Sequence, residues 1–284
     1  MIATDCSAAP TKQRDNEFTF DASDFERVRK LIYERAGISL SSSKQAMVYS
    51  RLSRRLRDLG LRTFSSYLKE LEHASGATAD SEWQEFVNCL TTNLTSFFRE
   101  GHHFLILAAK LAQRDGKRTR IWCNAASTGE EPYSIAMTVL DTLGERADVE
   151  IVCSDIDTKV LAQAKQGVYP LDSDGLGRER LRQHFLRGTG ANSGTIRVKP
   201  ALQRLVHFRS LNLMDAHWSL GEPFDIIFCR NVMIYFDAAT QRRVLIGMHR
   251  ALRQQGVLFA GHSENFTPSK DLFRLCGKTV YERL

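Results

Sequence analysis

The sequence predicts an α/β fold of the doubly wound class, with an all-α domain before it and a small β subdomain inserted into it. From about residue 100, short apolar runs alternate with amphipathic helical patterns, which favours a mainly parallel sheet with helices on both faces. Residues 21–92 show helical patterns alone. Between Gly167 and a strand at 206–210, about 40 residues hold more structure than a βαβ crossover needs. We therefore interpret residues 168–205 as the insertion.

Helical patterns organise the all-α domain. A capping box of Ser23 and Glu26 predicts the start of the first helix. Gly37 predicts its end, since glycine readily adopts the left-handed conformation that follows many helices. The second helix is expected over 43–59, with Gly60 beyond it. Two more helices are predicted from the apolar faces Phe64, Tyr67, Leu68 and Leu71, and Trp83, Phe86, Val87 and Leu90.

The α/β domain is expected to span 101–284. Its strands are predicted at 120–124, 150–154, 206–210, 224–230 and 257–261, before an antiparallel pair at 272–276 and 279–283. Helices are predicted at 131–143, 157–166 and 238–253, and the insertion should hold a helix at 179–186 and a strand at 195–199. Segment 93–100 joins the two domains. Its hydroxyls, amide, aromatic rings and arginine predict that it covers a cleft.

Composition and charge are those of an ordinary globular protein. The chain has 284 residues, of which 43% are hydrophobic and 25% charged, and its net charge of +6 permits an acidic partner without requiring nucleic acid. No apolar run approaches the roughly 20 residues of a membrane span, and the first ten residues lack a secretory signal. We interpret residues 1–20 as a flexible tail. Six cysteines without a C-x-x-C pair predict thiols in the cytoplasm, not disulfides or metal ligands.

The loop 124–129 lies between a predicted strand and a predicted helix. Its small residues let a ligand approach the backbone, and the helix start directs free N–H groups at that ligand. Glu130 and Glu131 stand at the same helix start, where they would repel a phosphate but suit an amino or sulfonium cation. This favours S-adenosylmethionine over a dinucleotide. The alternative for either glutamate is a first-turn role that complements the helix dipole.

Two aspartates end the second predicted strand of the α/β domain. Asp155 is placed to accept hydrogen bonds from ribose hydroxyls, as carboxylates do at this point in nucleoside-binding sheets. For Asp157 we favour the role of N-cap for the helix that follows.

Polar residues also follow the later strands. Asn212 and Leu213 offer an amide and an apolar side chain that suit the edge and face of an adenine. Arg230 and Asn231 end the fourth predicted strand beside the same cleft. Tyr235 follows them, either as a rim residue near a transferred methyl group or as a packing tyrosine with a backbone partner.

Five segments together resemble the chemotaxis receptor glutamate methyltransferases, the CheR family. In order, they are TTNLTSFFRE, NAASTGEEPYSIA, CSDID, FCRNVMIYF and GHSEN. The resemblance covers residues 21–284. It implies an N-terminal helical domain and a class I S-adenosylmethionine methyltransferase sheet with a small β insertion. It also implies transfer of a methyl group from S-adenosylmethionine to receptor glutamates, leaving S-adenosylhomocysteine.

The resemblance implies roles for individual residues. Cofactor binding is implied for Asn93, Thr95, Arg99, Ala125, Glu130, Asp155, Asn212, Leu213, Arg230 and Asn231. Arg99 and Tyr235 are the family positions nearest the reacting centre. An ionised glutamate needs no general base, so we interpret His262 in the last motif as structural.

Two surfaces are candidates for recognising a receptor. Arg51, Arg54 and Arg55 share a helical face that would attract an acidic helical bundle. Gly188 and Gly190 in the insertion suit a sheet edge that adds a peptide strand, and the resemblance implies a tethering peptide at a receptor's carboxyl terminus.

Two other functions fit parts of the sequence. One is a methyltransferase acting on nucleic acid, or on another protein, through the basic N-terminal helix. The other is a cofactor-binding sensor without activity, which the full set of site residues disfavours. We expect a monomer that neither inserts into a membrane nor binds nucleic acid.

Overall fold

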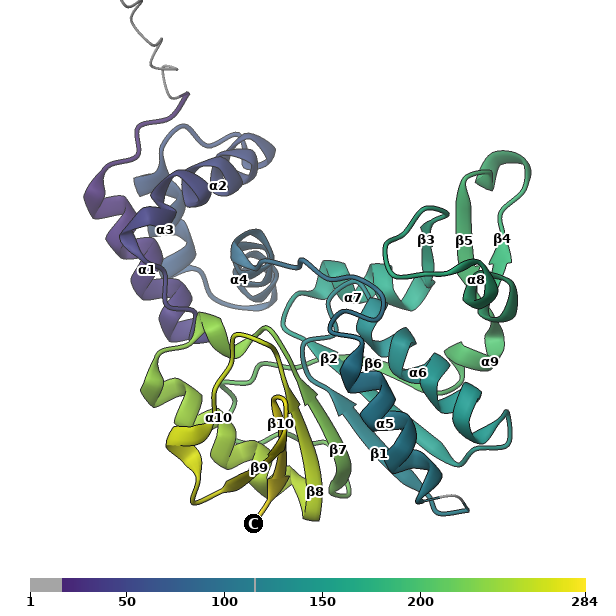
Figure 1. The fold of residues 1–284 in the computed structure, drawn as a ribbon. Coiled ribbons are helices and arrows are strands. Elements are labelled where there is room, and N and C mark those ends of the chain that lie inside the picture. The colour runs from purple at the N-terminus through teal and green to yellow at the C-terminus, as the bar shows by residue number, and fades with distance from the viewer. Residues whose placement is uncertain (1–16, 115) are drawn as a thin grey trace, which may run out of the picture.

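The computed structural model describes residues 17–114 and 116–284, so most of the predicted tail at 1–20 lies outside it. Within these residues the chain forms a group of N-terminal helices, a seven-stranded sheet and a separate three-stranded sheet (Figure 1). The fold class predicted from the sequence is therefore confirmed. No helix in the described part of the chain is long and apolar enough to cross a membrane.

The N-terminal helices share one core. They are α1 (Ala22–Ala36), α2 (Gln45–Leu59), α3 (Phe64–His73) and α4 (Ala77–Leu90), with a short 3-10 helix, η1 (Ser42–Lys44), before α2. Val28, Leu52, Phe64 and Phe86 are fully buried in this core. Figure 1 shows these purple and blue helices gathered on one side of the molecule.

Asp21 caps α1, so the predicted capping box of Ser23 and Glu26 is wrong. The Asp21 carboxylate accepts the backbone N–H of Asp24 at 2.9 Å, and the Ser23 hydroxyl donates to the same carboxylate at 2.7 Å. An aspartate that precedes the serine takes the helix-start N–H first. The helix ends as predicted at Gly37, with φ of 72°.

The large sheet has the order β6-β2-β1-β7-β8-β10-β9 in the described residues. Its strands are β1 (Thr119–Cys123), β2 (Val149–Asp155), β6 (Val206–Ser210), β7 (Phe224–Cys229), β8 (Leu252–Ala260), β9 (Phe273–Gly277) and β10 (Val280–Arg283). Strand β10 is antiparallel to both neighbours, and the other pairings are parallel. Strand β8 begins earlier than predicted because Leu252 pairs with Phe224 before a register shift.

Alternate strand residues face two cores. Ile121 and Cys123 pack in the core under α5 (His102–Ala112), α6 (Glu130–Leu143) and α7 (Thr158–Gln166). Trp122 points to the other core, under α10 (Ala238–Ala251). Helices on both faces explain why β1 is buried at every position.

Residues 168–203 leave the large sheet and form the small one. Its strands β3 (Val168–Pro170), β5 (Thr195–Val198) and β4 (Phe185–Arg187) lie antiparallel in that order, with α8 (Arg178–His184) and α9 (Pro200–Gln203) beside them. Strands β3 and β4 were not predicted, because three residues are too few for a visible alternation. A Cβ at Gly188 would lie 2.0 Å from the Asn192 carbonyl oxygen, so the β4–β5 turn requires glycine there.

Strand β1 marks the point where the winding of the large sheet reverses. Its neighbours are β2, reached by the first crossover, and β7, which begins the other half of the sheet. Parallel sheets open a crevice beyond the carboxyl ends of the strands at such a point. The polar residues singled out in the sequence follow β1, β2, β6 and β7 at this edge.

Candidate active site

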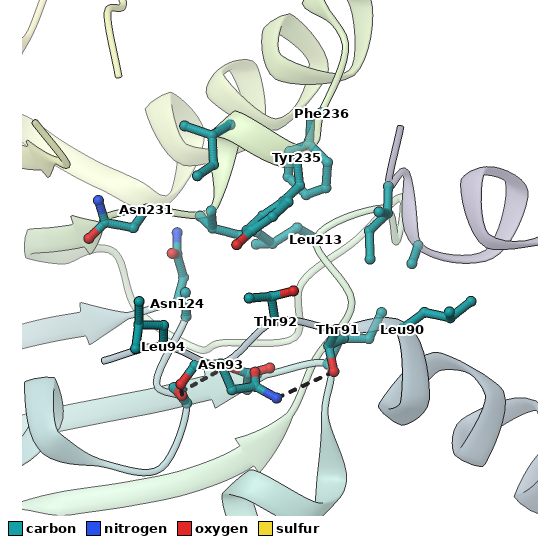
Figure 2. A pocket seen from close by; sticks show the side chains of 18 of the residues that line it. Leu90, Thr91, Thr92, Asn93, Leu94, Asn124, Leu213, Asn231, Tyr235 and Phe236 are labelled. Atoms are coloured by element: carbon teal, nitrogen blue, oxygen red, sulfur yellow. Dashed lines mark hydrogen bonds between the residues drawn. The ribbon is translucent and has the colours of Figure 1, made fainter. Parts of the chain in front are cut away.

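A cavity of about 490 Å³ lies at this crevice, within the usual size of a small-molecule site. Figure 2 shows Tyr235, Leu213 and Asn231 facing the linker residues Asn93 and Leu94 across it. Tyr235 and nearly all the residues expected at the cofactor line the cavity: Asn93, Thr95, Arg99, Ala125, Asp155, Asn212, Leu213, Arg230 and Asn231. These residues, predicted from separate parts of the sequence, therefore meet at one cavity.

Glu130 does not line the cavity, and Glu131 does. The Glu130 carboxylate accepts the Thr128 hydroxyl at 2.6 Å, and burial raises its pKa. Glu131 instead forms an ion pair with Arg230, inside the cavity wall. Adjacent helical residues point about 100° apart, so only one of two consecutive glutamates can face a given ligand.

Asp155 ends β2 and faces the cavity. Its carboxylate accepts the backbone N–H of Ser127 at 2.8 Å and of Asp157 at 3.0 Å. Burial raises the pKa of Asp155 to about 6, although these two bonds favour its charged form. Each oxygen keeps lone pairs for hydroxyl donors.

Asp157 has the predicted capping role and a second one. Its carboxylate accepts the N–H of Lys159 at 2.9 Å at the start of α7. It also accepts the Thr91 hydroxyl at 2.7 Å and the Asn93 amide at 2.8 Å. The Asn93 side chain thus anchors the linker, while the backbone carbonyl oxygen of Asn93 accepts the Ser127 hydroxyl at 3.0 Å.

Arg230 is a buried charge at the back of the cavity. It pairs with Glu131 and, at 3.3 Å, with Glu100, and it donates to the Arg99 carbonyl at 2.5 Å. Burial opposes the charge of Glu100, but Arg230 holds the pKa of Glu100 below its usual value. Burial and the same guanidinium lower the pKa of His103 to about 4, so this buried ring is neutral near pH 7.

Arg99 lies between two residues in the left-handed region, Phe98 with φ of 52° and Glu100 with φ of 57°. Its guanidinium donates to the Leu94 carbonyl at 2.9 Å, which closes the linker on itself. Ser127 and Asn231, also at the cavity, have positive φ as well. Strained backbone gathers at this site, as it commonly does at functional sites.

Glu264 is a residue that the sequence analysis missed. It accepts backbone N–H groups of Asn231 at 3.0 Å, Val232 at 2.9 Å, Met233 at 2.8 Å and Gly261 at 2.5 Å. Burial nevertheless raises its pKa. The motif GHSEN drew attention to His262, whose side chain is exposed. A buried carboxylate that binds loop N–H groups has no sequence pattern of its own.

The N-terminal helices complete the cavity wall. The Ser39 N–H donates to the Tyr235 carbonyl at 2.8 Å, and the Asn212 amide donates to the Arg35 carbonyl at 2.7 Å. Ile38 and Leu90 line the cavity itself. The amide that we expected beside an adenine therefore binds α1 in this structure.

The three arginines of α2 do not form the fully exposed basic face that the sequence analysis predicted. Arg51 donates to the Thr91 carbonyl at 2.6 Å, and Arg55 forms an ion pair with Glu82. Both are half-buried, whereas Arg54 is exposed and makes no ion pair with the described residues. Arg51 and Arg55 thus stabilise the fold, and of these three only Arg54 is free for a partner.

Comparison with protein families covers nearly the whole chain. Residues 23–91 match the family model described as "CheR methyltransferase, all-alpha domain". Residues 93–282 match "CheR methyltransferase, SAM binding domain". The chain belongs to the CheR methyltransferase family. The resemblance identified from the sequence motifs is thereby confirmed, and S-adenosylmethionine is the cofactor of its larger domain.

Curated relatives in the CheR family are similar over almost their full length. The chain is 52% identical over 272 residues to "Chemotaxis protein methyltransferase 2" of Pseudomonas aeruginosa, covering 94% of this chain and 95% of that protein. It is 50% identical over 259 residues to "Chemotaxis protein methyltransferase" of Escherichia coli K12, covering 90% and 89%.

The cavity suits S-adenosylmethionine. Asp155 offers a buried carboxylate for hydroxyl donors, and the apolar side chains of Leu213 and Phe236 line the same space. The α6 helix starts beside it with acidic residues rather than the phosphate-binding glycine pattern.

Proposed function

We propose that this protein transfers methyl groups from S-adenosylmethionine to glutamate side chains of chemoreceptors, forming methyl esters in the cytoplasm. The observation that carries the proposal is the family membership, with chemotaxis methyltransferases at up to 52% identity over most of the chain. The cavity supports it, because residues from both domains meet there.

In the proposed cofactor site, Asp155 accepts hydrogen bonds from the ribose hydroxyls. Leu213 flanks the adenine, while the Asn212 amide holds this wall of the cavity through its bond to the Arg35 carbonyl. Glu131, in place of Glu130, faces the cationic methionine part. Linker residues Asn93 and Thr95 cover the cofactor. The ion pair with Arg230 holds the Glu131 side chain in place.

The proposed reaction needs positioning more than acid–base chemistry. S-adenosylmethionine supplies an electrophilic methyl group. A glutamate has an ordinary pKa of about 4.3, so it arrives ionised at neutral pH and needs no base. A site that excludes water weakens solvation of the carboxylate, and alignment of the reacting groups can contribute roughly 7–11 kcal/mol in ideal cases.

Arg99 and Tyr235 are proposed to orient the acceptor. A tight ion pair between Arg99 and the attacking carboxylate would weaken the nucleophile, and Arg99 is already bonded to the Leu94 carbonyl. We therefore assign it to orientation of the substrate or the cofactor's carboxylate. Tyr235 faces the linker residues Asn93 and Leu94 across the cavity (Figure 2), and we assign it to shaping the path of the methyl group.

Receptor docking is proposed at two places. Arg54 attracts the acidic receptor helices, and the open edges of the small sheet near Gly188 and Gly190 suit a tethering peptide. A tether raises the effective receptor concentration without changing the chemistry. We propose that a monomer suffices for both contacts.

Transfer of radiolabelled methyl from S-adenosylmethionine to receptor-rich membranes tests the proposal. We expect label on protein that is released by alkali, because methyl esters hydrolyse and methylamines do not. Alkali-stable label on protein or nucleic acid would contradict the proposal and favour the alternative acceptors.

A further inference from the structure

The apolar side chain of Leu94 lies at the cavity, exposed instead of packed in a core. Its side chain is 81% exposed, the largest value among the big hydrophobic residues in the described ranges. The backbone around it is firmly held, since Arg99 donates to its carbonyl and Asp157 binds Asn93. The fixed backbone of the linker therefore keeps the Leu94 side chain exposed.

Ile234 repeats this arrangement on another wall of the cavity. It lies in the 3-10 helix η3 (Met233–Tyr235) and is 50% exposed. Glu264 fixes the start of η3 through the N–H groups of Val232 and Met233. Leu94 and Ile234 both line the cavity, beside Tyr235. Two rigidly presented apolar side chains thus flank the proposed place of methyl transfer.

Charged residues at the same cavity indicate which kind of partner can bind over Leu94 and Ile234. Lys44 is exposed there, and Arg99 is half-buried. The acidic residues in the lining belong to the proposed cofactor site, Asp155 at the ribose and Glu131, paired with Arg230, at the methionine part. The positive charges of Lys44 and Arg99 beside Leu94 and Ile234 therefore favour a partner that has a carboxylate next to apolar side chains.

We infer that Leu94 and Ile234 form an apolar rim that docks the helix carrying the methyl-accepting glutamate, contacting apolar side chains beside that glutamate. A helix suits this rim because residues three and four apart share one face, so one glutamate can enter the cavity between two apolar neighbours. The inference rests on the proposed function, and it names determinants of acceptor recognition that the cofactor site does not supply.

The test uses full-length Leu94→Ser and Ile234→Ser enzymes with a soluble receptor cytoplasmic fragment. Each substitution should raise the KM for the fragment about tenfold, because a buried leucine-sized contact is lost, with little change in kcat at saturation. Calorimetry with S-adenosylhomocysteine should give a Kd within about twofold of the wild type. Leu105→Ser is the matched control, since Leu105 is 75% exposed on α5 and does not line the cavity.

Several results would overturn the inference. One is an unchanged KM for the fragment in the rim variants, and another is an equal rise in KM with Leu105→Ser. A third is a rise in the cofactor Kd that parallels the rise in KM, because it would show that the cofactor covers Leu94. A wild-type dimer that either rim variant abolishes would assign the rim to a second copy of the chain. If the wild type itself leaves no alkali-labile label on the fragment, the proposed function fails, and not the rim alone.

Discussion

At the scale of single residues, the site depends on buried charges that bind the backbone of neighbouring segments. Asp155 holds the loop after β1, Glu264 holds the loop after β7, and Arg230 joins α6 to the linker. Backbone N–H groups paired with a buried carboxylate are costly to leave unpaired. These side chains fix the cavity before any ligand arrives.

Cofactor affinity should depend on pH through Asp155. Its pKa of about 6 means that the carboxylate becomes ionised as pH rises through that value, and only the ionised form accepts every surrounding donor. We expect the Kd for S-adenosylhomocysteine to fall between about pH 5 and pH 7. Calorimetry across this range measures it, and Asp155→Asn should weaken binding and remove the dependence. The same pH dependence in Asp155→Asn would contradict the assignment.

Glu264→Gln should loosen the loop that carries Asn231. The amide nitrogen would face N–H donors that now bind a carboxylate oxygen, which costs on the order of 1–3 kcal/mol. Thermal unfolding should show a lower Tm, and the cofactor Kd should rise. Glu179→Gln, on the exposed face of α8, is the control. An unchanged Tm and Kd in Glu264→Gln would contradict the role assigned to the carboxylate.

At the scale of elements, the linker after α4 and the helix α2 act together. Arg51 binds the Thr91 carbonyl and contacts the Thr92 hydroxyl at 3.3 Å, so α2 holds the start of the segment that covers the cavity. Arg54, one position from the buried Ser53, points to solvent. Neighbouring arginines of one helix therefore have separate roles.

Arg51 and Arg54 can be separated by measurement. Arg54→Glu should lower kcat/KM for the receptor fragment about threefold to tenfold, more at low salt, with the cofactor Kd unchanged. Arg51→Ala should raise the cofactor Kd, because the linker loses its anchor. Arg146→Glu, in an exposed loop after α6, is the control for net charge. Equal effects of Arg51→Ala and Arg54→Glu on both constants would contradict this division.

The elements also show which features a sequence can predict. Strands β1 and β7, buried on both faces, appear as continuous apolar runs, so their ends and the polar residues after them could be placed. The choice between Glu130 and Glu131 depends on the exact phase of α6, which helix boundaries predicted to within a residue or two do not resolve. Thr91 lies 40 residues from Arg51 in the chain, and Asn231, Val232 and Met233 lie 31 to 33 residues from Glu264, so only the fold reveals these partners.

At the scale of the whole molecule, both domains build one cavity. Residues of η1, α4 and the linker line it together with the ends of the large sheet. The hydrogen bonds Ser39–Tyr235 and Asn212–Arg35 join the domains at its edge. A ligand there should therefore stabilise both domains.

Cofactor binding should shift one cooperative unfolding transition. At a concentration of S-adenosylhomocysteine 100 times its Kd, the folded state gains about 2.7 kcal/mol, which raises Tm. Scanning calorimetry with and without the ligand measures the shift. Two transitions, of which only one moves, would contradict a cavity shared by both domains.

Locating the transferred methyl group tests the proposed function most directly. Wild-type enzyme, S-adenosylmethionine and a receptor cytoplasmic fragment are incubated, and the fragment is digested and sequenced by mass spectrometry. We expect methyl esters on glutamates of the fragment, and their loss when Tyr235→Ala and Asp155→Ala enzymes replace the wild type. Methylation on a nitrogen atom, or glutamate esters that both variants form at the wild-type rate, would contradict it.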